Sequence, residues 1–406
     1  MFCDRMLKQI FLWIKSFSFF VCVMSSIVTA KTVDQVTTDI KLLDVVLDDS
    51  SIIDPSFRKE EEAYLPYSNP VWSGYCADPH VILHEGLYYA YGTYLPHEEI
   101  EGIETPDMNG KKFILLRSKN LVNWECLGGA LVPYEGGEHV DHWAPEVAYA
   151  KGKFWMYYSA AEPMEAGWFQ RLRVAVADHP EGPFQDCGRL LFPEKGFTID
   201  PHPFRDPKDG QWYLYFSKDT LSGRPGTGIW VVQLGEDMMT PVGKPLPVVL
   251  PSADWQISIR NHRIYEQEFE AWHTVEGAHV VFREGKYYCF YSGSAWVTES
   301  YGVAFAVAEH PLGPWEDAGT TRGPCVLKAA PGVFGPGHNS VVIAPDGKTL
   351  VCAYHAWDEQ RVARQLRIDT IEWTENGPQV TPTLRGGRLS VGRRNEFFKK
   401  RIDEEH

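Results

Sequence analysis

The stretch Ala77-Asp78-Pro79-His80-Val81-Ile82-Leu83 decides the fold, because its pattern returns four more times along the chain. This polar motif leads into a short apolar run, and a turn at Gly86 separates that run from the aromatic run Tyr88-Tyr89-Ala90-Tyr91. Short runs rich in β-branched and aromatic residues on either side of a turn glycine indicate two paired strands. One such pair cannot bury its apolar face by itself, so its repetition indicates a stacked array.

The later copies keep the same order of polar motif, apolar strand, turn glycine and aromatic strand. They begin at Trp143-Ala144-Pro145-Glu146, Ile199-Asp200-Pro201-His202, Glu276-Gly277-Ala278-His279 and Gly337-His338-Asn339-Ser340. Their turn glycines stand at positions 86, 152, 210, 285 and 347, which gives gaps of 66, 58, 75 and 62 residues. A repeat of this size, built from short strands, predicts an all-β, five-bladed β-propeller. A two-sheet β-sandwich would not explain why the motif recurs in register with the turn glycine.

The beginning of the chain resembles a secretory signal peptide. Arg5, Lys8 and Lys15 precede an apolar run over residues 17–28, and small residues lead up to Ala30. A charged segment, an apolar segment and a small-residue cleavage site in this order predict removal of residues 1–30 and a secreted or periplasmic protein. Since no later stretch is apolar for long enough to span a bilayer, we expect no membrane partner after cleavage.

The rest of the chain divides into three parts by composition. Residues 31–65 are acidic and weakly patterned, and we interpret them as a linker or N-terminal arm. Residues 66–385 carry the repeats and form the predicted propeller, and residues 386–406 are a polar C-terminal tail. The six cysteines that follow the predicted signal peptide match no zinc-binding spacing, and their pairing stays open.

The charge balance excludes one class of partner. The chain has 39 Lys and Arg against 54 Asp and Glu, a formal net charge of −15. Proteins that bind a phosphate backbone normally carry the opposite sign, so we expect no nucleic-acid partner.

Carboxylates and a histidine stand at the start of the predicted innermost strands, which converge on the propeller axis. These positions hold Asp78, Glu146 or its neighbours, Asp200, Glu276 and His338. Several carboxyl groups beside aromatic side chains are typical of a hydrolytic site. Inverting glycoside hydrolysis needs one carboxylate and one carboxylic acid on opposite sides of the scissile bond, and a third carboxylate nearby can keep the acid protonated.

The five motifs, taken together and in this order, resemble the successive blade motifs of glycoside hydrolase family 43 over roughly residues 68–385. The resemblance implies that Asp78 is the general base that activates water and that Glu276 is the general acid. It also implies that Asp200 tunes the pKa of Glu276 and orients it. The sequence departs from the family pattern at Ala278, where Pro is common, and at Glu146, where Asp is common.

Four further residues enter the predicted site, three of them through the same resemblance. It implies that Trp143 stacks on sugar, that Arg367 lies near the acid and that His338 binds substrate. His279 is a further candidate for substrate binding because histidines recur near the strand starts, at His80, His202 and His279, although this recurrence could also reflect blade packing. His338 resembles an axial histidine that lies near a bound water or metal ion. No cofactor is required on this view, and a calcium ion near the propeller axis, held through water, is left open.

The resemblance implies a carbohydrate substrate and an inverting hydrolase that releases pentose, α-L-arabinofuranose or β-D-xylose. The insertion over residues 252–274 carries Trp255 and Trp272 and mildly favours a closed pocket and exo action. An endo-arabinanase with an open groove and a propeller that binds sugar without cutting it stay as alternatives. A retaining fructan-processing enzyme fits less well, because Glu125-Cys126 precedes Arg205-Asp206-Pro207 here and follows that motif in those enzymes.

Overall fold

The computed structural model describes residues 62–95, 103–164, 167–194 and 196–393. The described chain is almost entirely β-strand, with one short α-helix, α2 (Gly319–Arg322), and one 3-10 turn, η2 (Asp254–Gln256). Among the residues described, no helix combines the length and the apolar character needed to cross a membrane. The predicted signal peptide over residues 1–30 lies outside the described residues, as do residues 31–61 of the predicted arm.

Most strands form antiparallel meanders of four consecutive strands, and the described chain contains five of them. The first is β2 (Ala77–His84), β3 (Leu87–Thr93), β4 (Lys112–Ser118) and β5 (Trp124–Val132). The second is β6 (His142–Ala150), β7 (Lys153–Met164), β8 (Gly167–Ala177) and β9 (Phe184–Leu190). The third is β10 (Thr198–Arg205), β11 (Trp212–Thr220), β12 (Gly226–Leu234) and β13 (Pro241–Val249). The fourth is β16 (Val275–Arg283), β17 (Lys286–Gly293), β18 (Gly302–Ala308) and β19 (Glu316–Asp317). The fifth is β20 (Phe334–Ile343), β21 (Leu350–Trp357), β22 (Arg364–Thr374) and β23 (Gly377–Val380).

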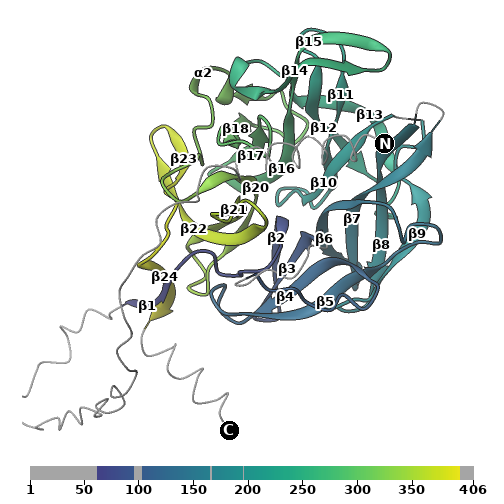
Figure 1. Cartoon of the computed structure of the whole chain (residues 1–406). Helices are drawn as coiled ribbons and strands as arrows, with labels where there is room; N and C mark the ends of the chain where they lie inside the picture. Colours follow the sequence, from purple (N-terminus) through teal and green to yellow (C-terminus); the bar gives the residue numbers. More distant parts are fainter. Residues whose placement is uncertain (1–61, 96–102, 165–166, 195, 394–406) are drawn as a thin grey trace, which may run out of the picture. The chain divides into compact units, whose positions relative to one another are not determined.

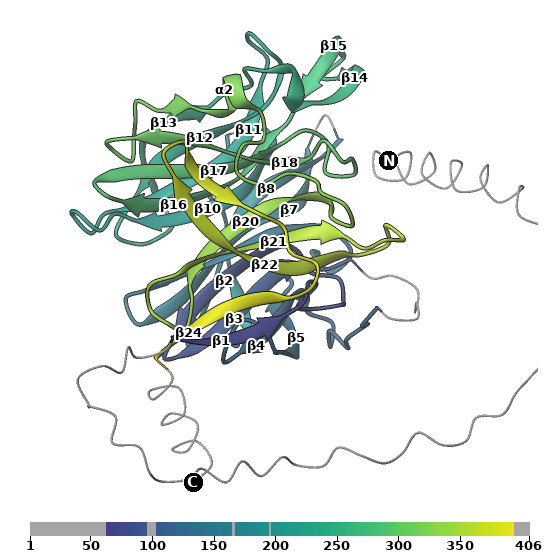
Figure 2. The same ribbon diagram turned by 90° about the vertical axis from the view of Figure 1, so that its left-hand side faces the viewer.

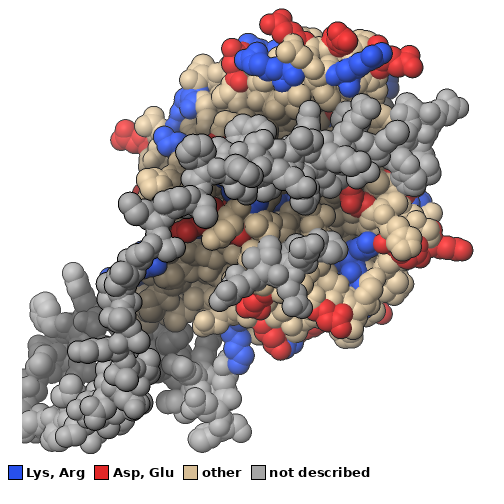
Figure 3. All heavy atoms as spheres, in the orientation of Figure 1, with Lys and Arg blue, Asp and Glu red and all other residues tan. Residues whose placement is uncertain are grey.

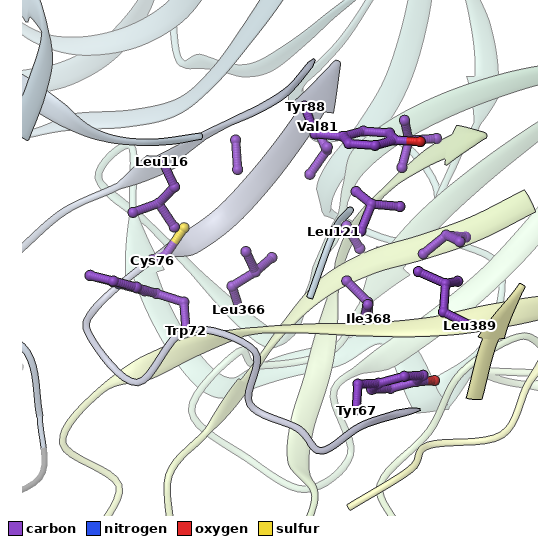
Figure 4. Close-up of a cluster of buried hydrophobic side chains, with 14 of the residues drawn as sticks. Tyr67, Trp72, Cys76, Val81, Tyr88, Leu116, Leu121, Leu366, Ile368 and Leu389 are labelled. Carbon is purple, nitrogen blue, oxygen red and sulfur yellow. The ribbon is translucent and has the colours of Figure 1, made fainter. Parts of the chain in front are cut away.

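The first strand of each meander lies innermost, and these five strands contact one another in a closed cycle. β2 contacts β6, and the cycle continues through β10, β16 and β20 back to β2 (Figures 1 and 2). Five hydrophobic clusters follow the same cycle, since each joins two neighbouring meanders. The cluster between the fifth and the first meander packs Val81 and Leu116 against Leu366 and Ile368 (Figure 4). Burial of apolar side chains between sheets therefore holds the ring together.

The turn glycines have the conformation that the repeat predicts. Gly86, Gly152 and Gly285 each follow a residue that also has positive φ, and each pair connects the first two strands of a meander. Positive φ at both central residues is the geometry of a type I′ hairpin turn, which matches the twist of the two strands. Glycine adopts it without a steric penalty.

A two-stranded sheet joins the two ends of the described chain. β1 (Glu62–Tyr67) pairs antiparallel with β24 (Gly387–Arg393), and Leu389 and Val391 of β24 are buried. Residues 387–393 of the predicted polar tail are therefore an ordered strand, because alternating apolar residues pack on the main body. Residues 394–406 of that tail lie outside the described residues.

The predicted insertion between the third and fourth meanders is a hairpin. η2 leads into β14 (Ile257–Ile264), which pairs with β15 (Gln267–His273), and β15 makes one parallel contact with β12. Figure 1 shows this hairpin extending beyond the third meander. The cysteines of the described residues are all free thiols.

Asn69 ties the beginning of the described chain to the fifth meander. Its buried side-chain amide donates to the carbonyls of Ile368 and Thr383 and to a carboxylate oxygen of Asp369, and its oxygen accepts the Ile368 N–H. These bonds close the ring from outside the innermost strands.

We predict that Asn69→Ala lowers the free energy of unfolding by about 2–3 kcal/mol, because it leaves buried backbone groups without partners. Urea unfolding followed by tryptophan fluorescence measures the loss. Asn123→Ala is the matched control, since Asn123 is exposed and donates to Asn120 through its backbone. Equal stability of the two variants would contradict this role for Asn69.

Candidate active site

The same irregularity interrupts all five innermost strands. The pairing of each first strand with the second breaks over two residues, and the first of these has a positive φ. The five residues with positive φ are Asp78, Ala144, Asp200, Gly277 and His338. Such a bulge bends the strand and redirects side chains, here towards the axis that the five strands surround.

Each bulge is held by the preceding meander. The Asp200 amide donates to Ser159 Oγ, the His338 amide to Ser292 Oγ, and the Asp78 amide to His355 Nδ1. The Ala144 amide donates to Thr93 Oγ1 in the same way. All four acceptors occupy one register position, opposite the residue that precedes the bulge. The hydrogen bonds satisfy buried amides that the broken ladder leaves free.

The fourth meander departs from this rule at the point where two predicted catalytic residues meet. The Gly277 amide donates 3.1 Å to Asp200 Oδ2 and not to Ser217, whose hydroxyl has no hydrogen-bond partner among the described residues. Asp200 is thereby bound to the backbone next to Glu276. The structure brings both residues together by this bond.

Asp78 is held as a carboxylate. Its Oδ1 lies 3.0 Å from Arg364 Nη1 and 3.4 Å from His338 Nδ1, and its Oδ2 accepts a 2.7 Å bond from Thr93. Burial is the largest single effect and by itself favours the neutral acid, but Arg364, His338 and His355 together outweigh it and hold the pKa of Asp78 well below its usual range. A buried, ionised carboxylate with a fixed orientation is suited to accept a proton from water.

Glu276 has the opposite electrostatic setting. Burial raises its pKa to about 7, an effect that the hydrogen bond from Tyr301 opposes and the charge of Asp78 adds to. The Tyr301 hydroxyl donates 2.8 Å to Glu276 Oε1. At neutral pH a large fraction of Glu276 therefore carries the proton that a general acid needs.

Asp200 contacts the Gly277 amide next to Glu276 and lies 4.0 Å from His338, which itself contacts Asp78. Burial raises its pKa well above the usual value, and the charges of Glu276 and Asp78 add to the effect. The Gly277 amide acts in the opposite direction, because it stabilises the ionised form. Asp200 and Glu276 each disfavour ionisation of the other, as expected of two neighbouring carboxyl groups.

A second set of polar side chains lies further along the innermost strands. Each member stands three residues after the residue that directly precedes the bulge. The set comprises His80, Glu146, His202 and His279, whose polar atoms lie within 4.8 Å of one another, and we call it the axial cluster. The equivalent residue of the fifth meander is Ser340. The position of Asp78 is thus occupied by Ala144 in the second meander, and Glu146 belongs to this deeper level together with His279.

The axial cluster does not fit the predicted calcium ion. Backbone amides donate to His80 Nδ1, His202 Nε2 and His279 Nε2, and burial lowers the pKa of all three rings. Each neutral ring then carries its proton on the other nitrogen, which faces the cluster. His202 donates that proton to Glu146 at 2.6 Å. A cation needs lone pairs, and calcium needs several oxygen ligands, but this cluster presents N–H groups and one carboxyl.

Trp143 occupies the same register position as Glu276, directly before the bulge of its meander. It is partly buried, whereas the neighbouring Ala144 is fully buried. His338 lies in the site, 3.4 Å from Asp78 and 4.0 Å from Asp200.

Arg367 is not the arginine that the structure places beside Asp78. That arginine is Arg364, and because side chains alternate along a strand, Arg367 points to the other face of β22. There burial lowers the pKa of Arg367, and Tyr354 and Asp369 oppose this effect. Sequence reasoning missed Arg364, since nothing in the sequence says which of the two faces the axis.

Tyr301, Thr93 and Trp296 were also missed. Trp296 stacks on Trp357 at 5.5 Å, and Arg364 lies 4.4 Å from the Trp296 ring centre. Thr93 could have been found, because it aligns with Ser159 and Ser292 when the copies are superposed. Tyr301 and Trp296 come from the connection between β17 and β18, where the repeat gives no pattern.

Comparison with known proteins agrees with this geometry. The family model of glycosyl hydrolases family 43 matches residues 67–378. An extracellular exo-alpha-(1->5)-L-arabinofuranosidase of Streptomyces chartreusis is 25% identical over 301 residues, covering 72% of this chain and 82% of the relative. A xylosidase/arabinosidase of Bacteroides ovatus is 26% identical over 308 residues, covering 66% and 83%.

A solved structure shares both fold and sequence with this chain. The crystal structure of a thermostable family-43 glycoside hydrolase superposes with a TM-score of 0.65 at 32% identity, covering 79% of this chain and 98% of that one. The family match spans most of the described residues, including all five bulges. The chain belongs to glycosyl hydrolase family 43 and is a glycoside hydrolase.

Proposed function

We propose that the protein is an exo-acting, inverting hydrolase of the α-L-arabinofuranosidase or β-xylosidase type, which releases a terminal pentose. The observation that carries this proposal is the opposite setting of two carboxyl groups in one site. Arg364 holds Asp78 ionised, while burial keeps Glu276 largely protonated near neutral pH. Paired groups with pKa values pushed apart supply the base and the acid of glycoside hydrolysis.

In this mechanism Asp78 takes a proton from water as the water oxygen attacks the anomeric carbon. Glu276 gives its proton to the departing glycosidic oxygen, which receives the electron pair of the broken bond. Because the water must fit between sugar and base, the two carboxyl groups should lie about 6.5–9.5 Å apart. Asp200 orients Glu276 through its bond to the neighbouring Gly277 amide and tunes the pKa of Glu276 as a coupled carboxyl group, and His338 keeps Asp78 in place.

The five meanders are, on this proposal, the five blades of a β-propeller, and the sugar enters at the end where the bulges lie. Trp143 directly precedes the bulge of β6, at the position equivalent to that of Glu276 in β16. From there its ring supplies an aromatic surface on which the sugar can stack. The arginine that acts in the site is Arg364, which contacts Asp78, and not Arg367. A calcium ion held through water near His338 stays a prediction.

The remaining predictions concern the whole protein. An extracellular relative from Streptomyces supports export, so we propose that residues 1–30 are removed and that the protein acts outside the cytoplasm or in the periplasm. On the described part of the face in Figure 3, acidic and basic side chains are interspersed around the rim. This mixed surface suits a neutral carbohydrate better than a polyanion.

The decisive experiment is hydrolysis of 4-nitrophenyl α-L-arabinofuranoside and 4-nitrophenyl β-D-xyloside, with linear arabinan alongside. We expect release of pentose from one of the two small glycosides, with inverted anomeric configuration in the first-formed sugar by proton NMR. Oligosaccharides from arabinan without cleavage of either glycoside would instead support an endo-arabinanase. Binding of arabinan without any cleavage would support the non-catalytic alternative.

We predict that Glu276→Gln and Asp78→Asn have different dependences on the leaving group. Both should lower kcat/KM on natural oligosaccharides by about 10²–10⁴-fold, since each removes one proton transfer. With a dinitrophenyl glycoside, which needs no acid, Glu276→Gln should recover most of this loss and Asp78→Asn should not. Glu125→Gln, at an exposed carboxylate of β5, is the control for the charge change. Equal losses on both substrates would contradict the acid role of Glu276.

The pKa values predict an asymmetric pH profile. The pKa of Glu276 is raised, so its acid form is present at low pH and is lost as pH rises through about 7. The pKa of Asp78 is lowered, so its carboxylate persists below the usual range of aspartate. We therefore expect kcat/KM to fall about tenfold per pH unit above neutrality and to stay high at pH 5. A maximum at pH 9 would contradict this assignment.

A further inference from the structure

Tyr301 makes the one hydrogen bond to Glu276 that the structure shows among the described residues. Its hydroxyl lies 2.8 Å from Glu276 Oε1, and its side chain is 1% exposed. Tyr301 directly precedes β18, while Glu276 belongs to β16 of the same meander. The contact therefore joins the acid to a connection that the repeat does not predict.

The fold reserves space for this tyrosine. In the fifth meander the position equivalent to Glu276 and Trp143 is Gly337. A Cβ atom on Gly337 would collide with the Tyr301 ring. The phenol ring thus fills the place where a fifth side chain would stand, and it stacks nearly parallel on His355 with ring centres 5.8 Å apart.

A chain of hydrogen bonds fixes the direction of the phenol proton. The His338 amide donates to Ser292 Oγ at 2.8 Å. Burial raises the pKa of Tyr301, and the Ser292 hydroxyl, which is placed to donate to the phenol, opposes this effect. Because the Ser292 oxygen already accepts the amide proton, its own hydroxyl proton is available for Tyr301 Oη. The proton of Tyr301 then points to Glu276 Oε1. Each bond in such a chain polarises the next.

We propose that Tyr301 is a positioning residue for the general acid, a proposal that rests on the acid role proposed for Glu276. Since Oε1 accepts from Tyr301, the transferable proton sits on Oε2, the oxygen left for the glycosidic bond. When Glu276 has given that proton to the leaving oxygen, Tyr301 keeps its bond to Oε1 and stabilises the carboxylate. The phenol keeps its own proton throughout.

Other groups near Glu276 set its charge together with Tyr301. Asp78 of β2 and Arg364 of β22 act on Glu276 directly, and Asp200 of β10 is coupled to it. His338 of β20 and His355 of β21 act on Asp78, and the His355 ring also stacks on Tyr301. Removing the phenol hydroxyl leaves all of these in place. The Tyr301→Phe variant therefore isolates the contribution of one hydrogen bond to an ionised acid.

The test is the pH dependence of kcat/KM for Tyr301→Phe. A lost donor to the ionised form raises the pKa of Glu276, so the alkaline limb should move up by about one pH unit. On a substrate with a poor leaving group, kcat should fall about tenfold or more, whereas a dinitrophenyl glycoside should be cleaved at nearly the wild-type rate. The proposal would be overturned if the alkaline limb of the pH profile did not move and kcat fell equally on both substrates.

Tyr354→Phe is the matched control. Tyr354 is as deeply buried, and its hydroxyl also donates 2.8 Å to a carboxylate, that of Asp369. It should lower thermal stability while leaving the alkaline limb unchanged. Replacement of Tyr301 by 3-fluorotyrosine covers the case in which Tyr301→Phe does not fold. This more acidic phenol is a stronger donor, so it should move the limb to lower pH, and a limb that stays in place would count against the proposal.

Glu276→Gln separates this proposal from the proposed function. If that variant keeps the wild-type alkaline limb, Glu276 is not the acid and both proposals fail. If Glu276→Gln removes the limb while Tyr301→Phe leaves it in place, only the role of Tyr301 is overturned.

Discussion

The hydrogen bond from the amide of a bulged residue to the preceding meander is the interaction on which the site depends. A residue with positive φ in mid-strand exposes its amide, and a side chain at one fixed register position accepts that amide in four of five cases. The bond orients the bulge and joins neighbouring meanders. Different side chains, such as those of Asp78, Asp200 and His338, therefore occupy the same kind of bulge with the same backbone conformation. This is possible because the scaffold binds only the backbone amide of the bulged residue.

The exceptions to this regularity carry the chemistry. Ser217 does not accept the Gly277 amide, and Asp200 accepts it instead, which binds that carboxylate beside Glu276, the proposed general acid. Gly337 has no side chain, so the Tyr301 ring occupies the space beside it, and the Tyr301 hydroxyl donates a hydrogen bond to Glu276. In both cases one contact of the repeated scaffold is missing, and an interaction at or beside Glu276 replaces it. Departures from local rules at a functional site are expected where the site needs a particular geometry.

Electrostatic interactions give two carboxyl groups of the site different protonation states. Asp78 and Glu276 are both buried carboxyl groups, and burial disfavours the charge of each. Only Asp78 lies beside a guanidinium, at 3.0 Å from Arg364, so only Asp78 is held well below its usual pKa. The histidines of the axial cluster remain uncharged because burial lowers their pKa values, and backbone amides fix their tautomers.

The sequence by itself determined the repeat, the turn glycines, the family and the carboxyl groups Asp78, Asp200 and Glu276, because strand period and turn chemistry act over a few residues. It left open a calcium ion near the axis, and the family resemblance implied that Arg367 lies near the predicted acid, Glu276. Only the tertiary structure decided that Arg364 faces Asp78, that Glu146 and His279 lie deeper, and that Tyr301 reaches Glu276. These outcomes depend on which face of a strand turns inward and on how connections fold over the axis, and both are set by packing between meanders that are distant in sequence.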